Sequence, residues 1–67
     1  GDPFWDLGSR KRVTVRTFKG STYVDIREFY EKDGKMLPGK KGISLKSGDY
    51  GLLKDLMDDI DEAIRNK

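Results

Sequence analysis

The sequence contains no cysteine and no histidine, and these two absences limit its chemistry. No disulfide can cross-link the chain, and the usual nitrogen and sulfur ligands of a zinc site are missing. The commonest general base and the thiol nucleophile are missing too, and there is no P-loop or GxGxxG motif, so we predict that the chain is not an enzyme. The acidic pairs Asp58-Asp59 and Asp61-Glu62 lack the loop geometry of a calcium site. We therefore predict no metal site and no cofactor.

Long apolar runs are also missing. None approaches the roughly 20 residues that a membrane-spanning helix needs, and no signal peptide is visible. The 67 residues form at most one domain, and a domain this small buries little surface. We divide the chain into a lead-in over 1–8, where Pro3 and Gly8 argue against regular structure throughout, and a domain over 9–67. With no disulfide or metal for support, the domain is predicted to gain buried area as a homodimer.

Charge is unevenly distributed along the chain. Residues 9–46 hold eleven Lys or Arg against four Asp or Glu, whereas residues 47–67 hold three against six. A basic segment of this kind attracts polyanions and steers their approach. The simpler alternative is that mixed charges only keep the surface soluble.

Residues 11–18 alternate strictly between two kinds of side chain, which predicts a β-strand. Val13 and Val15 face a core, while the opposite face carries Arg12, Arg16 and Phe18. A tight turn at Lys19–Ser21 leads to a second strand over 22–30. Strict alternation there places Phe29 beside Arg27 and turns Tyr30 away. Tyr30 reaches the basic side only if the strand bulges or ends near Glu28.

The remaining segments complete an α+β fold. Asp33-Gly34 predicts a hairpin turn, followed by a short third strand over 35–37 that Pro38-Gly39 ends, and a fourth strand over 40–45. Ser47 is the predicted N-cap of one helix, whose apolar stripe consists of Tyr50, Leu53, Leu56, Met57, Ile60 and Ile64. We thus expect a four-stranded antiparallel sheet followed by one C-terminal helix, with the stripe forming the homodimer contact.

The open sheet face combines cations with aromatic rings, which is typical of proteins that bind single-stranded nucleic acid. The cations expected to neutralise phosphates are Arg16, Lys19, Arg27, Lys40 and Lys41, helped by Lys11 and Arg12. Phe18 and Tyr30 are expected to stack on unpaired bases, which gives little base preference. The alternative for both rings is packing in a core or at a sheet edge. Gly39 and Gly42 either admit a ligand or only serve turn and bulge geometry.

Three stretches resemble the single-stranded DNA-binding domain of the transcriptional coactivator positive cofactor four family. They are the segments 13–20, 24–30 and 38–45, and residues 59–65 resemble the end of that family's helix. The resemblance extends over about residues 4–67. It implies a curved four-stranded antiparallel sheet, a homodimer formed largely through the helices, and a role with RNA polymerase II in the nucleus, with transcription proteins as partners.

The resemblance also implies binding positions in this sequence, which are Arg16, Phe18, Lys19, Gly20, Arg27, Tyr30, Pro38 and Lys41. Three residues depart from the family pattern: Tyr30 where many relatives have Trp, and Leu37 and Ser21 where relatives often have Lys. Lys35, Lys40 or Arg10 are candidates to replace the lost phosphate contacts.

Two alternative functions remain open from the sequence. The first is a small dimeric adaptor whose acidic helix face binds a basic protein. Aromatic rings set among arginines argue against it, because an adaptor gains nothing from them. The second is a single-stranded RNA binder, since nothing in the sequence reads a 2′-hydroxyl.

Overall fold

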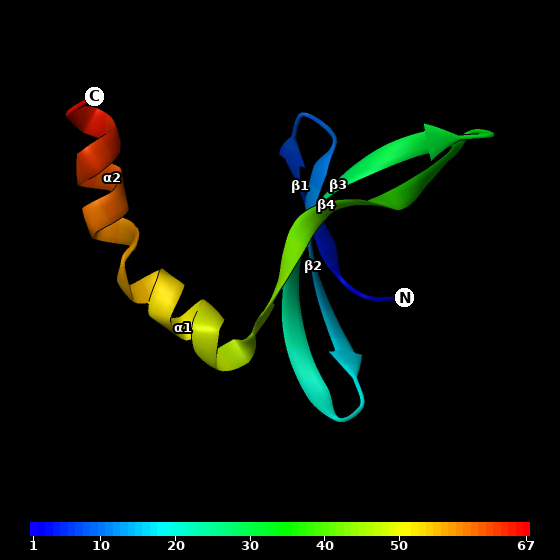
Figure 1. The fold of residues 1–67 in the computed structure, drawn as a ribbon, viewed down its shortest axis with the longest axis horizontal. Coiled ribbons are helices and arrows are strands. Elements are labelled where there is room, and N and C mark those ends of the chain that lie inside the picture. The colour runs from blue at the N-terminus through cyan, green and yellow to red at the C-terminus, as the bar shows by residue number, and fades with distance from the viewer.

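The structure is a computed structural model that describes all residues 1–67. Four strands form one curved antiparallel sheet in sequential order, and two short helices follow it (Figure 1). The strands are β1 (Phe4–Gly8), β2 (Lys11–Phe18), β3 (Ser21–Lys32) and β4 (Lys35–Lys46). The helices are α1 (Ser47–Asp55) and α2 (Met57–Arg65). The predicted α+β class and four-stranded antiparallel sheet are confirmed, but the chain has two helices rather than one.

The two long hairpins follow from their turn chemistry. Lys19 and Gly20 both have positive φ angles, 50° and 79°, as do Asp33 and Gly34, 54° and 76°. Two successive positive φ angles give the type I′ turn, whose twist matches that of the flanking strands. The β2–β3 and β3–β4 hairpins therefore form as predicted, and they extend to opposite ends of the sheet (Figure 1).

Much of the predicted lead-in over 1–8 is a regular strand, which the sequence did not predict. Phe4–Gly8 forms β1, which pairs with β2 so that Phe4 lies opposite Thr14 and Trp5 opposite Val13. Pro3 precedes this strand and Gly8 ends it, and the register of the β1–β2 pairing shifts between Asp6 and Gly8. The strand ends in a turn in which Gly8, Ser9 and Arg10 all have positive φ angles.

The predicted third and fourth strands are one continuous strand, β4. Pro38 does not end it, because β4 is the outer strand of the sheet and Pro38 still lies opposite Phe29. Between Pro38 and Gly42, three residues of β4 lie opposite the single residue Glu28. We call this segment, Gly39–Lys41, the bulge. It lets the strand pass through the Pro-Gly pair without breaking.

The predicted single helix is divided at Leu56. Leu56 has φ −96° and ψ −1°, and its N–H donates to the carbonyl oxygen of Leu53 rather than one residue further back. Ser47 is also not the N-cap: Lys46 precedes the helix without a side-chain capping bond, and Ser47 is already helical. The reason is that β4 continues to Lys46 and leaves no loop in which Ser47 could take the extended capping conformation.

The core of the single chain is very small. Only Val24 and Asp25 are buried among all 67 residues. Helix α1 packs against β3 and β4, whereas α2 contacts α1 and no strand, and it extends away from the sheet (Figure 1). Large apolar side chains of both helices are therefore exposed, among them Leu52, Leu56, Met57, Ile60 and Ile64. Neither helix has the length and apolar character needed to cross a membrane.

Candidate nucleic-acid interface

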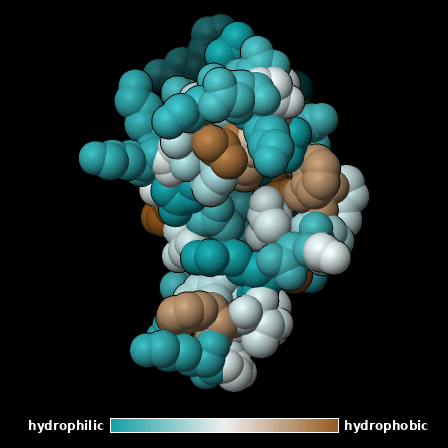
Figure 2. All heavy atoms as spheres, turned by 90° about the vertical axis from the view of Figure 1, so that its right-hand side faces the viewer, coloured by the Kyte–Doolittle hydropathy of each residue, from teal (hydrophilic) through white to brown (hydrophobic).

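The β2–β3 register assigns the side chains of the central strands to two faces. Arg12 lies opposite Arg27 and Arg16 opposite Tyr23, while the valines of β2 lie opposite Ile26 and Val24. The arginines of β2 and β3 thus share one face, and the valines and Ile26 share the other, as alternation predicts. We call the first the basic face; it carries Arg12, Thr14, Arg16, Phe18, Tyr23, Asp25, Arg27, Phe29, Gly42 and Ser44. The side of the molecule away from the helices is mostly hydrophilic, with scattered apolar side chains (Figure 2).

A hollow of about 370 Å³ lies on the basic face. It brings together three of the predicted site residues, Arg16, Arg27 and Pro38. The rest of its lining comes from Gly39, for which a ligand role was one of two alternatives, and from Thr14, Asp25 and Phe29, which the sequence did not single out as site residues. Alternation alone could have found Thr14, Asp25 and Phe29, because they share a face with Arg16 and Arg27.

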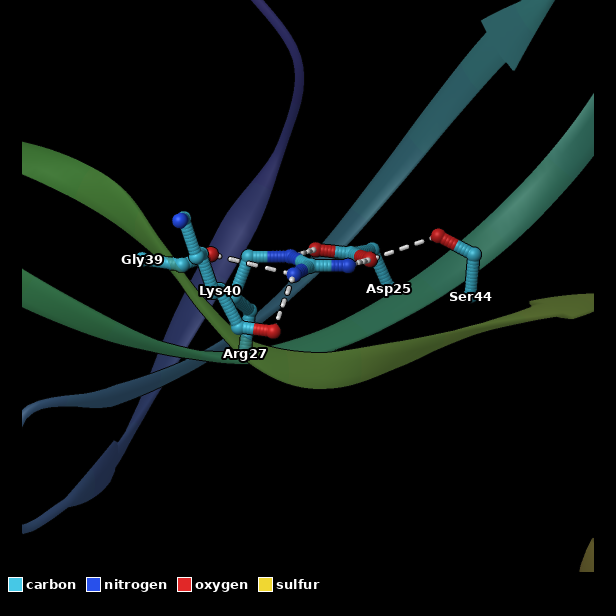
Figure 3. Close-up of polar contacts among 5 residues, drawn as sticks. All are labelled: Asp25, Arg27, Gly39, Lys40 and Ser44. Atoms are coloured by element: carbon cyan, nitrogen blue, oxygen red, sulfur yellow. Dashed lines mark hydrogen bonds and ion pairs between the residues drawn. The ribbon is translucent and has the colours of Figure 1, made fainter.

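Two residues of this lining, Asp25 and Arg27, form an ion pair (Figure 3). The Nε and Nη2 atoms of Arg27 each donate to a carboxylate oxygen of Asp25, at 3.0 Å in both cases. The hydroxyl of Ser44, which lies opposite Asp25 in the ladder, donates to the same carboxylate at 2.6 Å. Burial alone would raise the pKa of Asp25, but the hydrogen bonds from Arg27 and Ser44, with the attraction of Arg27 and Arg16, lower it below the usual 3.8. Asp25 is therefore a carboxylate at neutral pH.

Arg27 also reaches the bulge. Its Nη1 donates to the carbonyl oxygen of Gly39 at 3.0 Å and to that of Lys40 at 3.4 Å (Figure 3). The guanidinium thus makes four hydrogen bonds within the protein, and the side chain is only 22% exposed. Few of its donors remain for a phosphate, in contrast to the exposed Arg16.

The β2–β3 turn presents three further predicted site residues. Phe18 is 54% exposed, and the Lys19 ammonium lies 5.4 Å from the centre of its ring. Gly20 supplies the positive φ of the turn, and no atom lies near the place where a side chain would start. An exposed ring beside an exposed cation is an arrangement that can stack on a base and meet its phosphate.

Tyr30, Lys40 and Lys41 lie near the β3–β4 hairpin. They line a second hollow of about 250 Å³ together with Gly39. Tyr30 is 47% exposed, but alternation along β3 continues, so that Phe29 and not Tyr30 shares the basic face with Arg27. The bulge opposite Glu28 lies in β4, so it does not change the face to which each side chain of β3 points. Tyr30 lies nine residues beyond Ser21, the partner of Phe18, which corresponds to about 30 Å at a rise of ~3.3 Å per residue.

Lys11 lies apart from the basic face. It pairs with Glu28 and, by alternation, points to the side of the valines. A third hollow of about 340 Å³ is lined by Lys11, Ile26, Arg27, Glu28, Lys41 and Gly42. The structure therefore does not bring Lys11 together with Arg16, but it brings Lys11 and Lys41 to one hollow.

Arg12 has surroundings that sequence reasoning missed. Its guanidinium lies 4.3 Å from the ring centre of Phe4 and 4.9 Å from that of Phe29, and its Nε donates to Asp6 at 3.2 Å. A cation between two aromatic rings ties β1 to the basic face. The contact between Arg12 and Phe4 could not be predicted from the sequence, because no strand was predicted at Phe4 and its pairing with β2 was unknown.

The comparisons with known proteins agree with this geometry. The profile of the family described as Transcriptional Coactivator p15 (PC4) matches residues 5–56. The RNA polymerase II transcriptional coactivator KIWI of Arabidopsis thaliana is 48% identical over 59 residues, covering 88% of this chain and 55% of that protein. The coactivator SUB1 of Saccharomyces cerevisiae is 50% identical over 66 residues, covering 96% of this chain and 23% of that protein. The chain thus spans only part of these relatives, which are named as coactivators and not as enzymes.

Two solved structures share the fold. A crystal structure of a MoSub1–ssDNA complex matches with a TM-score of 0.92 and 38% identity, over 98% of this chain and 80% of that chain. A crystal structure of a MoSub1–DNA complex, described as revealing a novel DNA-binding mode, matches with a TM-score of 0.91 and 38% identity, over 98% and 84% of the two chains. Sequence, fold and family profile therefore agree with the resemblance stated above. The chain belongs to the PC4 family of transcriptional coactivators.

Proposed function

We propose that this chain binds single-stranded DNA with little base preference and acts as a transcriptional coactivator. One observation supports this most directly: the exposed ring of Phe18 lies beside Lys19 on the basic face, and the exposed ring of Tyr30 lines a hollow with Lys40 and Lys41 near the β3–β4 hairpin. The similarity to chains solved in complex with single-stranded DNA supports the same ligand.

Phosphates are expected to meet the exposed cations Arg16, Lys19, Lys40 and Lys41. Phe18 is expected to stack on a base at the basic face. Tyr30 lies about 30 Å away along the sheet and, by alternation, on its other face, so it would stack on a base only where the bound strand passes round the β3–β4 end of the sheet. Stacking accepts any base, because every base has a π-face, and phosphate contacts carry no base information. Gly20, Arg27 and Pro38 contribute by shaping the turn and the hollow, and Lys11 extends the positive potential to the other face of the sheet.

The functional unit is proposed to be a homodimer that joins through the helices. Helix α2 contacts no strand, and its apolar side chains Met57, Ile60 and Ile64 are exposed in the single chain. A single chain with two buried residues has too small a core to be stable alone. A second copy that covers the apolar stripe supplies the missing buried area.

We infer that the chain acts in the nucleus, with proteins of the RNA polymerase II machinery. The names of the relatives support this place of action. Binding of single strands suits transcription because the two strands of melted duplex expose unpaired bases.

A titration of labelled single-stranded DNA, single-stranded RNA and duplex DNA against the protein, over a salt series, tests the proposal. We expect tighter binding of single-stranded DNA than of duplex, similar affinity for oligonucleotides of different sequence, and a slope of log K against log salt of about −3 if four cations meet phosphates. The Arg16→Ala variant should bind all sequences more weakly and show a shallower slope. Absence of salt-dependent binding would favour the adaptor, and tighter binding of RNA would favour the RNA binder.

A further inference from the structure

An acidic side chain lies in the centre of the basic face. Asp25 is one of the two buried residues, 6% exposed, and it is flanked by Arg16 and Arg27 on the face proposed to bind phosphates. On charge alone, a carboxylate here repels a polyanion and weakens binding. Its position therefore calls for a structural role that outweighs the repulsion.

The contacts of Asp25 show which group it holds. Both of its oxygens accept from Arg27, and one also accepts from Ser44, so the guanidinium is fixed in a two-point fork. Forked pairs of this kind fix orientation as well as adding energy. The orientation leaves Nη1 directed at the bulge, where it donates to the carbonyl oxygens of Gly39 and Lys40 (Figure 3).

The bulge receives this contact where the ladder is interrupted. All three of its residues lie opposite the single residue Glu28 of β3, and Arg27 supplies a donor to the carbonyl groups of Gly39 and Lys40. The Nη1 group of Arg27 is the only side-chain donor that reaches these carbonyl groups. The same segment carries the exposed side chains of Lys40 and Lys41. Fixing the bulge backbone therefore fixes the points from which both lysines extend.

We propose that Asp25 is a positioning residue that acts through Arg27: it orients the guanidinium, which holds the Gly39–Lys41 bulge in one conformation and so places Lys40 and Lys41 for phosphate contact. This proposal rests on the proposed function. It assigns Arg27 a role inside the protein, with Lys40 and Lys41 as the groups that meet the ligand.

Charge and positioning give opposite expectations for one substitution. Asp25→Asn removes a negative charge from the basic face, which by Coulomb attraction alone should tighten DNA binding. Under the positioning role the amide no longer holds Arg27 by two charged bonds, and binding should weaken by about tenfold. Arg27→Lys retains the positive charge but cannot form the fork, and it should weaken binding to a similar degree. Asp6→Asn is the matched control, because it removes the same charge from the exposed partner of Arg12 and should not weaken binding.

Double mutants that combine Asp25→Asn with a lysine substitution distinguish the positioning role of Asp25 from a general loss of stability. In the Asp25→Asn background, Lys40→Ala and Lys41→Ala should each cost less affinity than in the wild type, because the lysines are already misplaced. Lys19→Ala, at the distant β2–β3 turn, should cost the same in both backgrounds. Equal costs at all three lysines, or unchanged or tighter binding by Asp25→Asn, would overturn the proposal.

A measurement without DNA tests the bulge itself. In the free protein, backbone ¹⁵N order parameters of Gly39, Lys40 and Lys41 should fall from about 0.85 to below about 0.6 in Asp25→Asn, while those of Lys19 and Gly20 stay unchanged. An unchanged bulge would overturn the proposal even if the wild type binds DNA, and a wild type that fails to bind DNA would instead refute the proposed function. If Asp25→Asn does not fold, Ser44→Ala removes one bond to the carboxylate without changing charge and should shift the same order parameters less strongly.

Discussion

Gly42 lies directly opposite Arg27 in the β3–β4 ladder, and a Cβ atom on Gly42 would lie 2.8 Å from the Cα of Arg27. The same Cβ would lie 2.6 Å from the carbonyl oxygen of Ile26. Both neighbours are backbone atoms that cannot move without disturbing β3. We therefore expect Gly42→Ala to lower the free energy of unfolding by about 1–3 kcal/mol, measured by urea denaturation at one fixed protein concentration.

Gly48→Ala is the matched control for this substitution. Gly48 lies in α1, and no atom lies within 4 Å of the place where its Cβ would stand. Alanine is the better helix former by about 0.5–1 kcal/mol, so Gly48→Ala should leave the stability unchanged or raise it. Equal destabilisation by both variants would show that the close approach of β4 to β3 is not the cause.

The ion pair of Asp25 has a pH signature. Since hydrogen bonds from Arg27 and Ser44 lower the pKa of Asp25 in the fold, its contribution to stability is present above the unfolded pKa of about 3.9 and is lost as the pH falls through the lower folded value. The difference in unfolding free energy between wild type and Asp25→Asn should be constant above about pH 5 and shrink below about pH 4. Thermal melts from pH 2 to 8 measure it. A difference that stays constant down to pH 2 would contradict the lowered pKa.

Phe18 and Tyr30 distinguish stacking from packing. Both rings are about half exposed, so Phe18→Ala and Tyr30→Ala should change the free energy of unfolding little. Each should cost ~1–3 kcal/mol of affinity for single-stranded DNA if the ring stacks on a base. Val24→Ala, in the buried core, is the control: it should lower stability by about 2 kcal/mol. A folded Phe18→Ala protein that binds single strands as tightly as the wild type would refute stacking.

The proposed dimer depends on α2. Ile60→Glu or Ile64→Glu introduces a charge into the exposed apolar stripe without touching any strand, and we expect the dimer to dissociate in analytical ultracentrifugation. Glu62→Gln, on the opposite side of the helix, should leave the dimer intact. A wild type that sediments as a 7.7 kDa monomer at low micromolar concentration would contradict the dimer.

The central hairpin was predictable because its signals are local. Valines that alternate with arginines in β2, and the Lys19-Gly20 turn, determine the strands, their faces and their connection. β1 was not predictable in this way, since Phe4 and Trp5 gain their extended conformation from pairing with β2. The pairing, and with it the stacking of Phe4 on Arg12, is a property of the assembled sheet.

Pro38-Gly39 shows the limit of turn signals. The pair reads as the end of a strand, yet at the outer edge of a sheet a bulge accommodates it and β4 continues. Leu56 is the reverse case, because no proline or glycine marks the point where the helix divides. In the site, alternation correctly grouped Arg16 with Arg27. It could not show that the guanidinium of Arg27 donates its hydrogen bonds to Asp25 and to the bulge.

The location of the bound strand is the central claim, and NMR chemical-shift mapping tests it most directly. A single-stranded oligonucleotide is titrated into ¹⁵N-labelled protein, and shifts are followed along the backbone. We expect the largest changes at Arg16, Phe18, Lys19 and the bulge, with none at the acidic residues Asp58, Asp59 and Glu62 of α2. Changes confined to the valine side of the sheet or to the helices, with the basic face unaffected, would contradict the account.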